Sequence, residues 1–113
     1  MKIVQDSITL TEIREMAAHS FGDMVKADVD VAKGIIALDA ELHSDLEAIL
    51  IENGSKQGDI WGINLYPELK GNEFIEFDSM INMRPSQGNK SRGIDNNNIR
   101  NIIIEIIGKI VKK

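Results

Sequence analysis

The sequence predicts an α+β fold in which an antiparallel sheet of four to five strands, built from two hairpins, packs against three helices. Three observations lead to this prediction. Apolar residues recur every three or four positions in three segments, which is typical of helices that bury one face. Elsewhere apolar and polar residues alternate, which is typical of half-buried strands. Turn-forming residues separate these alternating segments, and the expected order is β-α-β-β-α-β-β-α in one domain spanning residues 1–113.

The first half of the chain should begin with a short strand and a helix and continue with a hairpin. Thr9 and Glu12 have the spacing of a capping box, so the first helix should begin at Thr9, and Gly22 should end it. Alternating residues then predict a strand over residues 24–31 and its partner over residues 35–43, with a glycine turn between them.

The middle of the chain should contain a short helix and a second hairpin. Ser44 and Glu47 form another capping box, and Gly54 should end the helix that it opens. A strand is expected over residues 61–65. The longest alternating run of the sequence, residues 75–84, predicts the strand that follows.

The C-terminal part should consist of a loop and a helix. Residues 85–93 are all polar or turn-forming, which indicates an exposed loop, and Asp95 should cap the last helix. Isoleucines at helical spacing form a core stripe, but Ile104, Ile107 and Val111 extend it beyond one face. Either this helix is deeply buried or it contacts a partner, which would be a second copy in a homo-oligomer.

The composition is that of an ordinary folded protein. Of the 113 residues, 42% are hydrophobic and 27% are charged, so the chain can bury a core without cross-links. The absence of cysteine excludes disulfides, thiolate zinc sites and thiol nucleophiles. No segment has the roughly 20 apolar residues of a membrane span, and the first residues lack a secretory apolar core, so we expect a cytoplasmic protein without membrane contact.

The charges are unevenly distributed. Residues 1–83 contain 6 Lys or Arg and 16 Asp or Glu, which gives −10, whereas residues 84–113 contain 7 and 2, which gives +5. The acidic total and the five aromatic residues disfavour a nucleic-acid partner. The basic part is therefore more consistent with a small anionic ligand.

Polar residues should gather on one face of the sheet if the helices cover mainly the other. The second strand ends at His43, and the last strand contributes Glu76 and Asp78. Imidazole and carboxylate groups in proximity can perform general acid-base catalysis. We therefore predict His43, Asp78 and Glu76 as catalytic residues, with the carboxylates as base or metal ligands and His43 as a proton shuttle. A solvated sheet face without activity has the same pattern, and no particular metal or cofactor is predicted.

The segment that follows offers groups that bind anions. Arg84, Lys90 and Arg92 have no acidic residue between them, and arginine matches phosphate or carboxylate oxygens with paired hydrogen bonds. Lysine does not directly follow glycine here, so the segment is not a P-loop. A solvated loop that balances the acidic remainder of the chain is an equal alternative. The residues predicted to bind the ligand are Arg84, Ser86, Gln87, Asn89, Lys90, Arg92 and Asn82.

Three stretches are similar to a known family. They are AELHSD at residues 40–45, WGINLYP at residues 61–67 and FDSMINMRPSQGN at residues 77–89. Over nearly its full length the chain resembles a family of short prokaryotic proteins of unassigned function. The resemblance implies no activity, cofactor or residue role.

These observations leave three functional hypotheses. The first is a binding protein for a small molecule that carries phosphate or carboxylate, with hydrolysis as an open extension. The second is a homo-oligomeric interaction module without catalysis, assembled through the last helix. The third is a nucleic-acid-associated protein of the toxin or antitoxin kind. Whether the protein is an enzyme stays open at this point.

Overall fold

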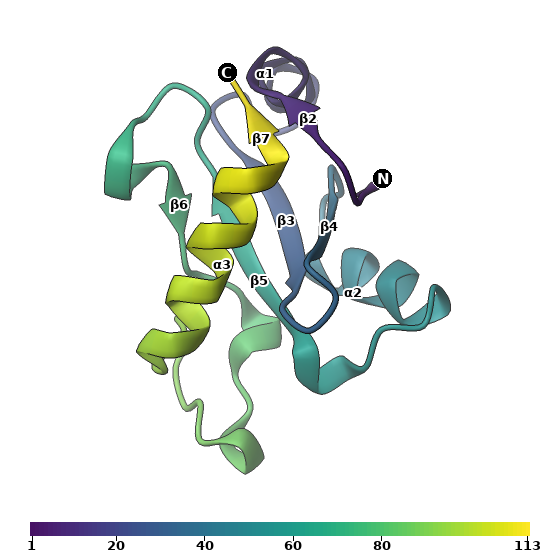
Figure 1. Cartoon of the computed structure of the whole chain (residues 1–113), viewed down its shortest axis with the longest axis vertical. Coiled ribbons are helices and arrows are strands. Elements are labelled where there is room, and N and C mark those ends of the chain that lie inside the picture. The colour runs from purple at the N-terminus through teal and green to yellow at the C-terminus, as the bar shows by residue number, and fades with distance from the viewer.

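A five-stranded antiparallel sheet with the strand order β1-β4-β3-β5-β6 forms the centre of the computed structural model, which describes residues 1–113 (Figure 1). The strands are β1 (Lys2–Val4), β3 (Val25–Asp30), β4 (Ile35–Leu38), β5 (Ile60–Leu65) and β6 (Ile75–Glu76). The helices are α1 (Leu10–Ala18), α2 (His43–Glu52) and α3 (Asn97–Ile110). The α+β fold and the predicted order of helices and strands are confirmed, and β3 with β4 and β5 with β6 are the two hairpins.

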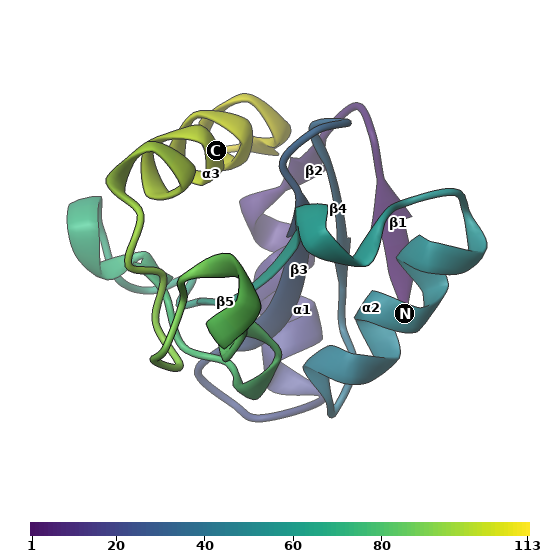
Figure 2. The same cartoon turned by 90° about the horizontal axis from the view of Figure 1, so that it is seen from below.

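Helices cover both faces of the sheet. On one face, α1 and α3 pack against apolar side chains of β3, β4 and β5 and form the larger core. On the other face, Leu46 and Leu50 of α2 pack against Ala37 and Ile60. Figure 2 shows α3 and α2 on opposite sides of the strands. The helices thus lie mainly on one face, as expected, but α2 covers part of the other face, which we expected to be solvated.

A second, smaller sheet joins the two ends of the chain. β2 (Ile8–Thr9) pairs in parallel with β7 (Val111–Lys112), and Ile8 lies opposite Val111. Ile8 is buried in the larger core. This pairing places the end of α3 beside the start of α1 (Figure 1).

The helix starts were predicted correctly for α1 only. Thr9 caps α1, and its capping box with Glu12 is complete. α2 begins at His43 without any side-chain cap, because the His43 ring is directed to a backbone carbonyl of β5 and this draws the residue into the first helical turn. α3 is capped by Asn96 rather than Asp95, whose carboxylate instead accepts hydrogen bonds in the preceding loop.

Two predicted strands are shorter than expected. β4 ends at Leu38, because Asp39 has a φ of +73°, a left-handed backbone conformation that breaks the alternation of a strand. The strand predicted over residues 75–84 was wrong beyond Glu76, and the chain forms a 3₁₀ turn at Met80–Asn82 instead. Beyond Glu76, apolar and polar residues still alternate along the sequence, but the backbone that carries them is not extended.

The side chain of Asn82 takes the place of the missing strand. Its Oδ1 accepts a hydrogen bond from Gly62 N at 2.8 Å, and its Nδ2 donates to Gly62 O at 2.9 Å. An amide side chain thus pairs with both backbone groups of one residue in β5, as a neighbouring strand would. A Cβ atom on Gly62 would lie 2.6 Å from Ser79 Cβ, so only glycine permits this approach.

The predicted loop 85–93 is organised around a buried asparagine. Asn89 Nδ2 donates to Asn82 O at 2.7 Å and to Gly93 O at 2.8 Å, while its Oδ1 accepts from Asp95 N at 2.8 Å. The backbones of Arg84 and Asn89 also form an isolated bridge. Residues 85–93 therefore form an ordered loop around a buried polar side chain.

None of the three helices is both long and apolar enough to cross a membrane.

We expect Asn82→Ala to lower the free energy of unfolding by about 2–4 kcal/mol, because it leaves the buried N–H and C=O of Gly62 without partners. Urea denaturation followed by circular dichroism measures this. Asn98→Ala, at an exposed position of α3, is the control and should change stability by less than about 0.5 kcal/mol. Equal effects of the two substitutions would contradict the structural role of Asn82.

Candidate functional site

A cavity of about 450 Å³ lies beside the N-terminal end of α2. This volume is within the range of small-molecule sites. We call this cavity the polar pocket. Its lining residues are Met24, Lys26, Leu42, His43, Ser44, Asn64, Tyr66, Glu76, Asp78, Met80, Ile81 and Arg92.

The register of the sheet places three polar residues of the pocket in one row. Lys26 of β3 is paired with Asn64 of β5, which is paired with Glu76 of β6. Side chains at directly opposite positions of antiparallel strands lie on the same face and within contact distance. Asn64 Nδ2 donates to Glu76 Oε1 at 2.8 Å, whereas the buried Asn64 Oδ1 has no hydrogen-bond partner. The row therefore leaves one buried acceptor unpaired.

Tyr66 extends this network. Its hydroxyl donates to Glu76 Oε1 at 3.1 Å. Burial, followed by the hydrogen bond to Glu76, raises the pKa of Tyr66, so the hydroxyl keeps its proton. Glu76 Oε1 thus accepts two hydrogen bonds from β5 and its extension, which fixes the carboxylate in place.

The orientation of His43 is set by the backbone of β5. His43 Nε2 lies 2.8 Å from Ile63 O, and a carbonyl can only accept, so Nε2 carries the hydrogen and Nδ1 keeps its lone pair. Burial lowers the pKa of His43, and the charge of Lys26 lowers it further, while hydrogen bonding to Ile63 and Asn64 and the charge of Asp78 oppose these effects. The ring is therefore neutral near pH 7, and Nδ1 is not used in the hydrogen bond to Ile63 O.

An exposed ion pair forms another part of the wall. Arg92 Nε donates to Asp78 Oδ1 at 2.8 Å, and Arg92 Nη2 lies 3.4 Å from Asp78 Oδ2. The two side chains are 54% and 43% exposed, so the pair contributes at most about 1 kcal/mol and can open at little cost. Lys26 Nζ donates to Glu41 O at 2.8 Å and lies 5.1 Å from the ring centre of Phe21.

The structure brings together all three predicted catalytic residues. His43, Glu76 and Asp78 line the polar pocket, and Arg92 of the predicted ligand-binding set joins them. No group of three or more histidine and acidic side chains is arranged to hold a metal ion. The carboxylates are instead engaged by hydrogen-bond donors of the protein.

Arg84 is not brought to this pocket. Its Nη2 forms an ion pair with Glu47 Oε2 at 3.1 Å, and the two side chains are only 10% and 14% exposed. The guanidinium also lies 5.0 Å from the ring centre of Trp61. This arginine links α2 to β5, and it does not line the polar pocket.

The other predicted ligand-binding residues also lie elsewhere. Asn82 and Asn89 are buried and bond to backbone groups, as described above. Ser86, Gln87 and Lys90 are exposed and lie outside the polar pocket, and Gln87 Nε2 donates to Gly58 O at 3.1 Å.

Among the pocket residues that the sequence analysis did not predict are three polar residues in β3, in β5 and directly after β5: Lys26, Asn64 and Tyr66. The signal was present, because in a strand over residues 61–65 the apolar Trp61, Ile63 and Leu65 share one face, which places residues 62, 64 and 66 on the other. That face is also the face of Lys26.

A buried carboxyl group lies deeper on the same sheet face. Asp28 is 0% exposed, and neither of its oxygens has a hydrogen-bond partner. Burial raises the pKa of Asp28 to about 9, with a further contribution from Glu47 that Arg84 partly opposes. Asp28 therefore holds a proton at neutral pH. By contrast, the carboxylate of Asp30, two residues further along β3, accepts hydrogen bonds from Ser55 Oγ and two backbone N–H groups.

The predicted oligomer contact of α3 is only partly available. Ile107 is buried in the core of its own chain, and Val111 is half-buried against the same core. Ile104 is 48% exposed. Packing within the chain thus covers two of these three residues, and no partner subunit is needed to explain them. Homo-oligomerisation stays a prediction.

The comparisons with known proteins place the chain in a family. The family described as "Protein of unknown function (DUF5674)" matches residues 2–110. The chain therefore belongs to this family, as the resemblance of its three sequence stretches indicated. No curated protein and no solved structure shows significant similarity to the chain.

We expect His43 to titrate below its ordinary pKa of 6.5, because burial disfavours the charged ring. Nitrogen chemical shifts in a pH series measured by NMR should also identify Nε2 as the protonated nitrogen of the neutral ring. A pKa above 6.5 would contradict the dominant effect of burial, and the opposite tautomer would contradict the hydrogen bond from Nε2 to Ile63 O.

Asp28→Asn should make the protein less sensitive to high pH. The folded protein holds the Asp28 proton up to about pH 9, whereas the unfolded chain loses it near pH 3.8, so folding becomes less favourable as pH rises between these values. The advantage of the variant should grow from pH 5 to pH 8 by at most about 1.4 kcal/mol per pH unit.

Asp30→Asn is the matched control on the same strand. It should destabilise the protein by about 1–3 kcal/mol, because it weakens hydrogen bonds to a charged group. Denaturant unfolding at several pH values measures both variants. A wild type and an Asp28→Asn variant with parallel pH profiles would show that Asp28 does not hold a proton.

Proposed function

We propose that the protein binds a small polar molecule carrying a phosphate or carboxylate group in the polar pocket, and that His43 is the proton acceptor of a hydrolytic reaction there. The observation that carries this proposal is the fixed tautomer of His43. A neutral imidazole with one nitrogen anchored and the other free, at the wall of a cavity, is the arrangement of a general base.

The charges of the pocket support a ligand with groups of both signs. Lys26 and Arg92 are balanced by Glu76 and Asp78. A bare anion would meet two carboxylates as well as two cations. A molecule that combines an anionic group with hydrogen-bond donors would use both kinds of side chain.

The groups present are sufficient for hydrolysis of an ester. A water oxygen would form a bond to the electrophilic carbon or phosphorus while its proton passes to His43 Nδ1. The bond to the leaving oxygen would then break, and the ring would return the proton to that oxygen. The charge of Asp78 favours the protonated ring, and Arg92 would stabilise the anionic centre.

We further propose a cytoplasmic location, since a chain without cysteine suits a reducing compartment.

The binding half of the proposal is tested with phosphoethanolamine, which carries a phosphate and an ammonium group. An NMR titration should give saturable shifts at the pocket residues, weaker binding of inorganic phosphate, and a higher pKa of His43 in the complex. Arg92→Ala should weaken binding at least tenfold. The control is Arg14→Ala, because Arg14 forms an equally short and exposed ion pair, with Glu68, outside the polar pocket.

Chemical-shift changes outside the pocket, or equal losses of affinity in the two arginine variants, would rule out the binding site.

The catalytic half of the proposal is tested by hydrolysis of 4-nitrophenyl phosphate. His43→Gln can still donate to Ile63 O but has no basic nitrogen, so it should lose at least about a hundredfold in rate. Equal rates in the wild type and this variant would reject His43 as the base while leaving the binding site intact.

A further inference from the structure

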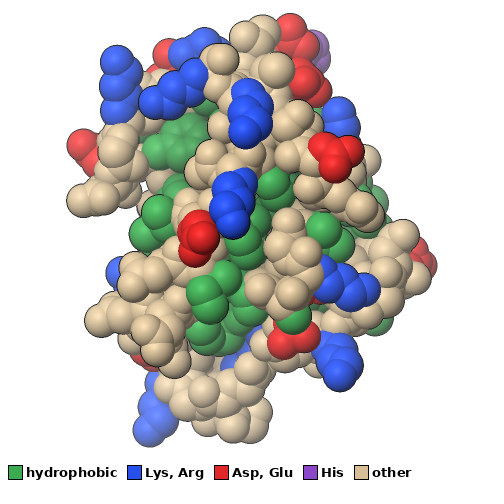
Figure 3. All heavy atoms as spheres, in the orientation of Figure 1, with side chains coloured by type: hydrophobic (Ala, Val, Ile, Leu, Met, Phe, Trp, Pro, Cys, Tyr) green, Lys and Arg blue, Asp and Glu red, His purple; other side chains and the backbone are tan.

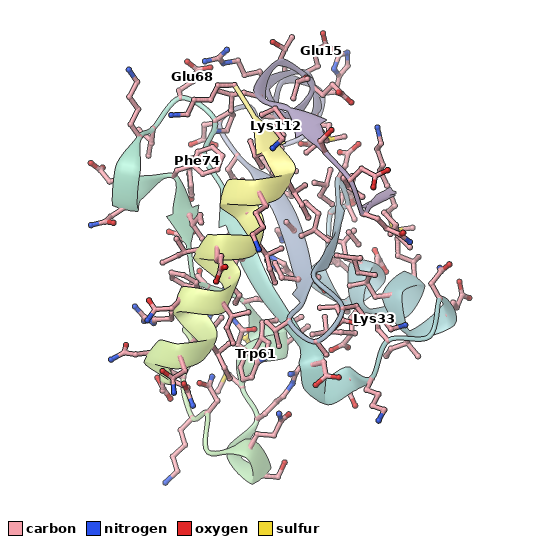
Figure 4. All side chains as sticks on the ribbon, in the orientation of Figure 1. Glu15, Lys33, Trp61, Glu68, Phe74 and Lys112 are labelled. Atoms are coloured by element: carbon pink, nitrogen blue, oxygen red, sulfur yellow. The ribbon has the colours of Figure 1, made fainter.

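A larger cavity lies on another part of the molecule and shares no residue with the polar pocket. It has a volume of about 810 Å³ and is formed by the start of α1, the connection from β5 to β6, and the end of α3 with β7. In Figure 3, hydrophobic side chains are visible in this hollow with Lys and Arg side chains around it. Figure 4 shows Phe74 between the β5–β6 connection and the end of α3. We call this cavity the apolar groove.

The walls of the apolar groove include aliphatic side chains that the fold leaves uncovered. Leu69 is 42% exposed and Ile104 is 48% exposed, and both line the groove. Ile75 and Ile107 lie in the same wall but pack with the core of the protein. Exposed aliphatic residues that line a common cavity, rather than scattered single positions, are typical of a binding surface.

A glycine deepens the groove at its α3 wall. Gly108 lies within α3, where glycine is less favourable than alanine because the unfolded chain is more flexible. A Cβ atom at this position would meet no other atom within 4 Å, so no close packing requires the glycine. Ile104 lies four positions before it on the same side of α3, and Val111 of β7 also lines the groove. The missing side chain therefore leaves open space where the isoleucine stripe would otherwise continue.

The charges of the groove favour an anion. Arg14, Lys70 and Lys113 line it, against one acid, Glu68, which is already paired with Arg14 at 2.8 Å. This local excess of positive charge contrasts with the net charge of −5 of the whole chain. A second copy of the chain docked by a two-fold axis would bring these cations face to face, which disfavours a symmetric dimer at this surface.

We propose that the apolar groove binds a single-chain aliphatic carboxylate, with the hydrocarbon chain along Phe74, Ile104 and Gly108 and the carboxylate beside Lys70 and Lys113. A long aliphatic chain would remove the exposed Leu69 and Ile104 from water, and its one negative charge would offset the excess of cationic side chains. This site is independent of the proposed function of the polar pocket.

The ligand class is tested by calorimetric titration with dodecanoate at concentrations below micelle formation. We expect one saturable site. Decanoate should bind about 15-fold more weakly, because each buried CH₂ contributes roughly 0.8 kcal/mol, or about fourfold in Kd. Dodecanol, which has the same chain without the charge, should bind at least several-fold more weakly than dodecanoate.

Two substitutions of the same glycine locate the site. Gly108→Phe should fill the groove and weaken dodecanoate binding at least tenfold, whereas Gly108→Ala leaves most of the space and should retain binding. Both variants should melt at or above the wild-type temperature, since they remove a helix glycine. Lys70→Glu should weaken binding several-fold, and Lys56→Glu, an exposed lysine outside the groove, should not.

Several results would overturn the proposal. Failure of the wild type to bind dodecanoate would do so directly, and so would binding that Gly108→Phe leaves unchanged. Sedimentation of the wild type provides a further check. A dimer that Gly108→Phe converts to a monomer, without dodecanoate binding, would assign the groove to a second copy instead. Binding to anionic vesicles without binding of monomeric dodecanoate would assign it to a membrane surface.

Discussion

The pair of hydrogen bonds between the Asn82 side chain and the backbone of Gly62 is the contact on which the arrangement of the site depends. Peptide groups of a buried strand must be paired, and β6 is too short to pair with Gly62. Because the side-chain amide does so, the chain can leave the sheet after Glu76 and turn. The Asn82 amide also binds Arg92 O, so the turn returns Arg92 to the pocket wall, where it meets Asp78.

The polar pocket is otherwise a product of sheet register. Lys26, Asn64 and Glu76 are side by side because three strands pair in one alignment, and His43 is anchored to the residue that precedes Asn64. A slip of one residue in β5 would turn Asn64 to the core and move an apolar side chain into the pocket. The pairing that forms the core therefore also sets the chemistry of the site.

Local patterns predicted the features that depend on local rules. Alternation located β3 and β5, and applied consistently it would also have found Asn64 and Tyr66. The strand over residues 75–84 was predicted wrongly, because alternation cannot reveal that the Asn82 side chain replaces a strand. The burial of Arg84 beside α2 was equally inaccessible, since a charged residue in a polar segment has the pattern of an exposed one. Both features arise from contacts between distant parts of the chain.

The parallel pairing of β2 with β7 has a consequence for the order of events during folding. Residues 8–9 and 111–112 must meet, so this small sheet closes the longest loop of any strand pairing in the fold and cannot form before residue 112 has been synthesised. The end of α3 and β7 also supply one wall of the larger cavity. That cavity, and the part of the main core that α3 supplies, are therefore completed only after most of the sheet can already have formed.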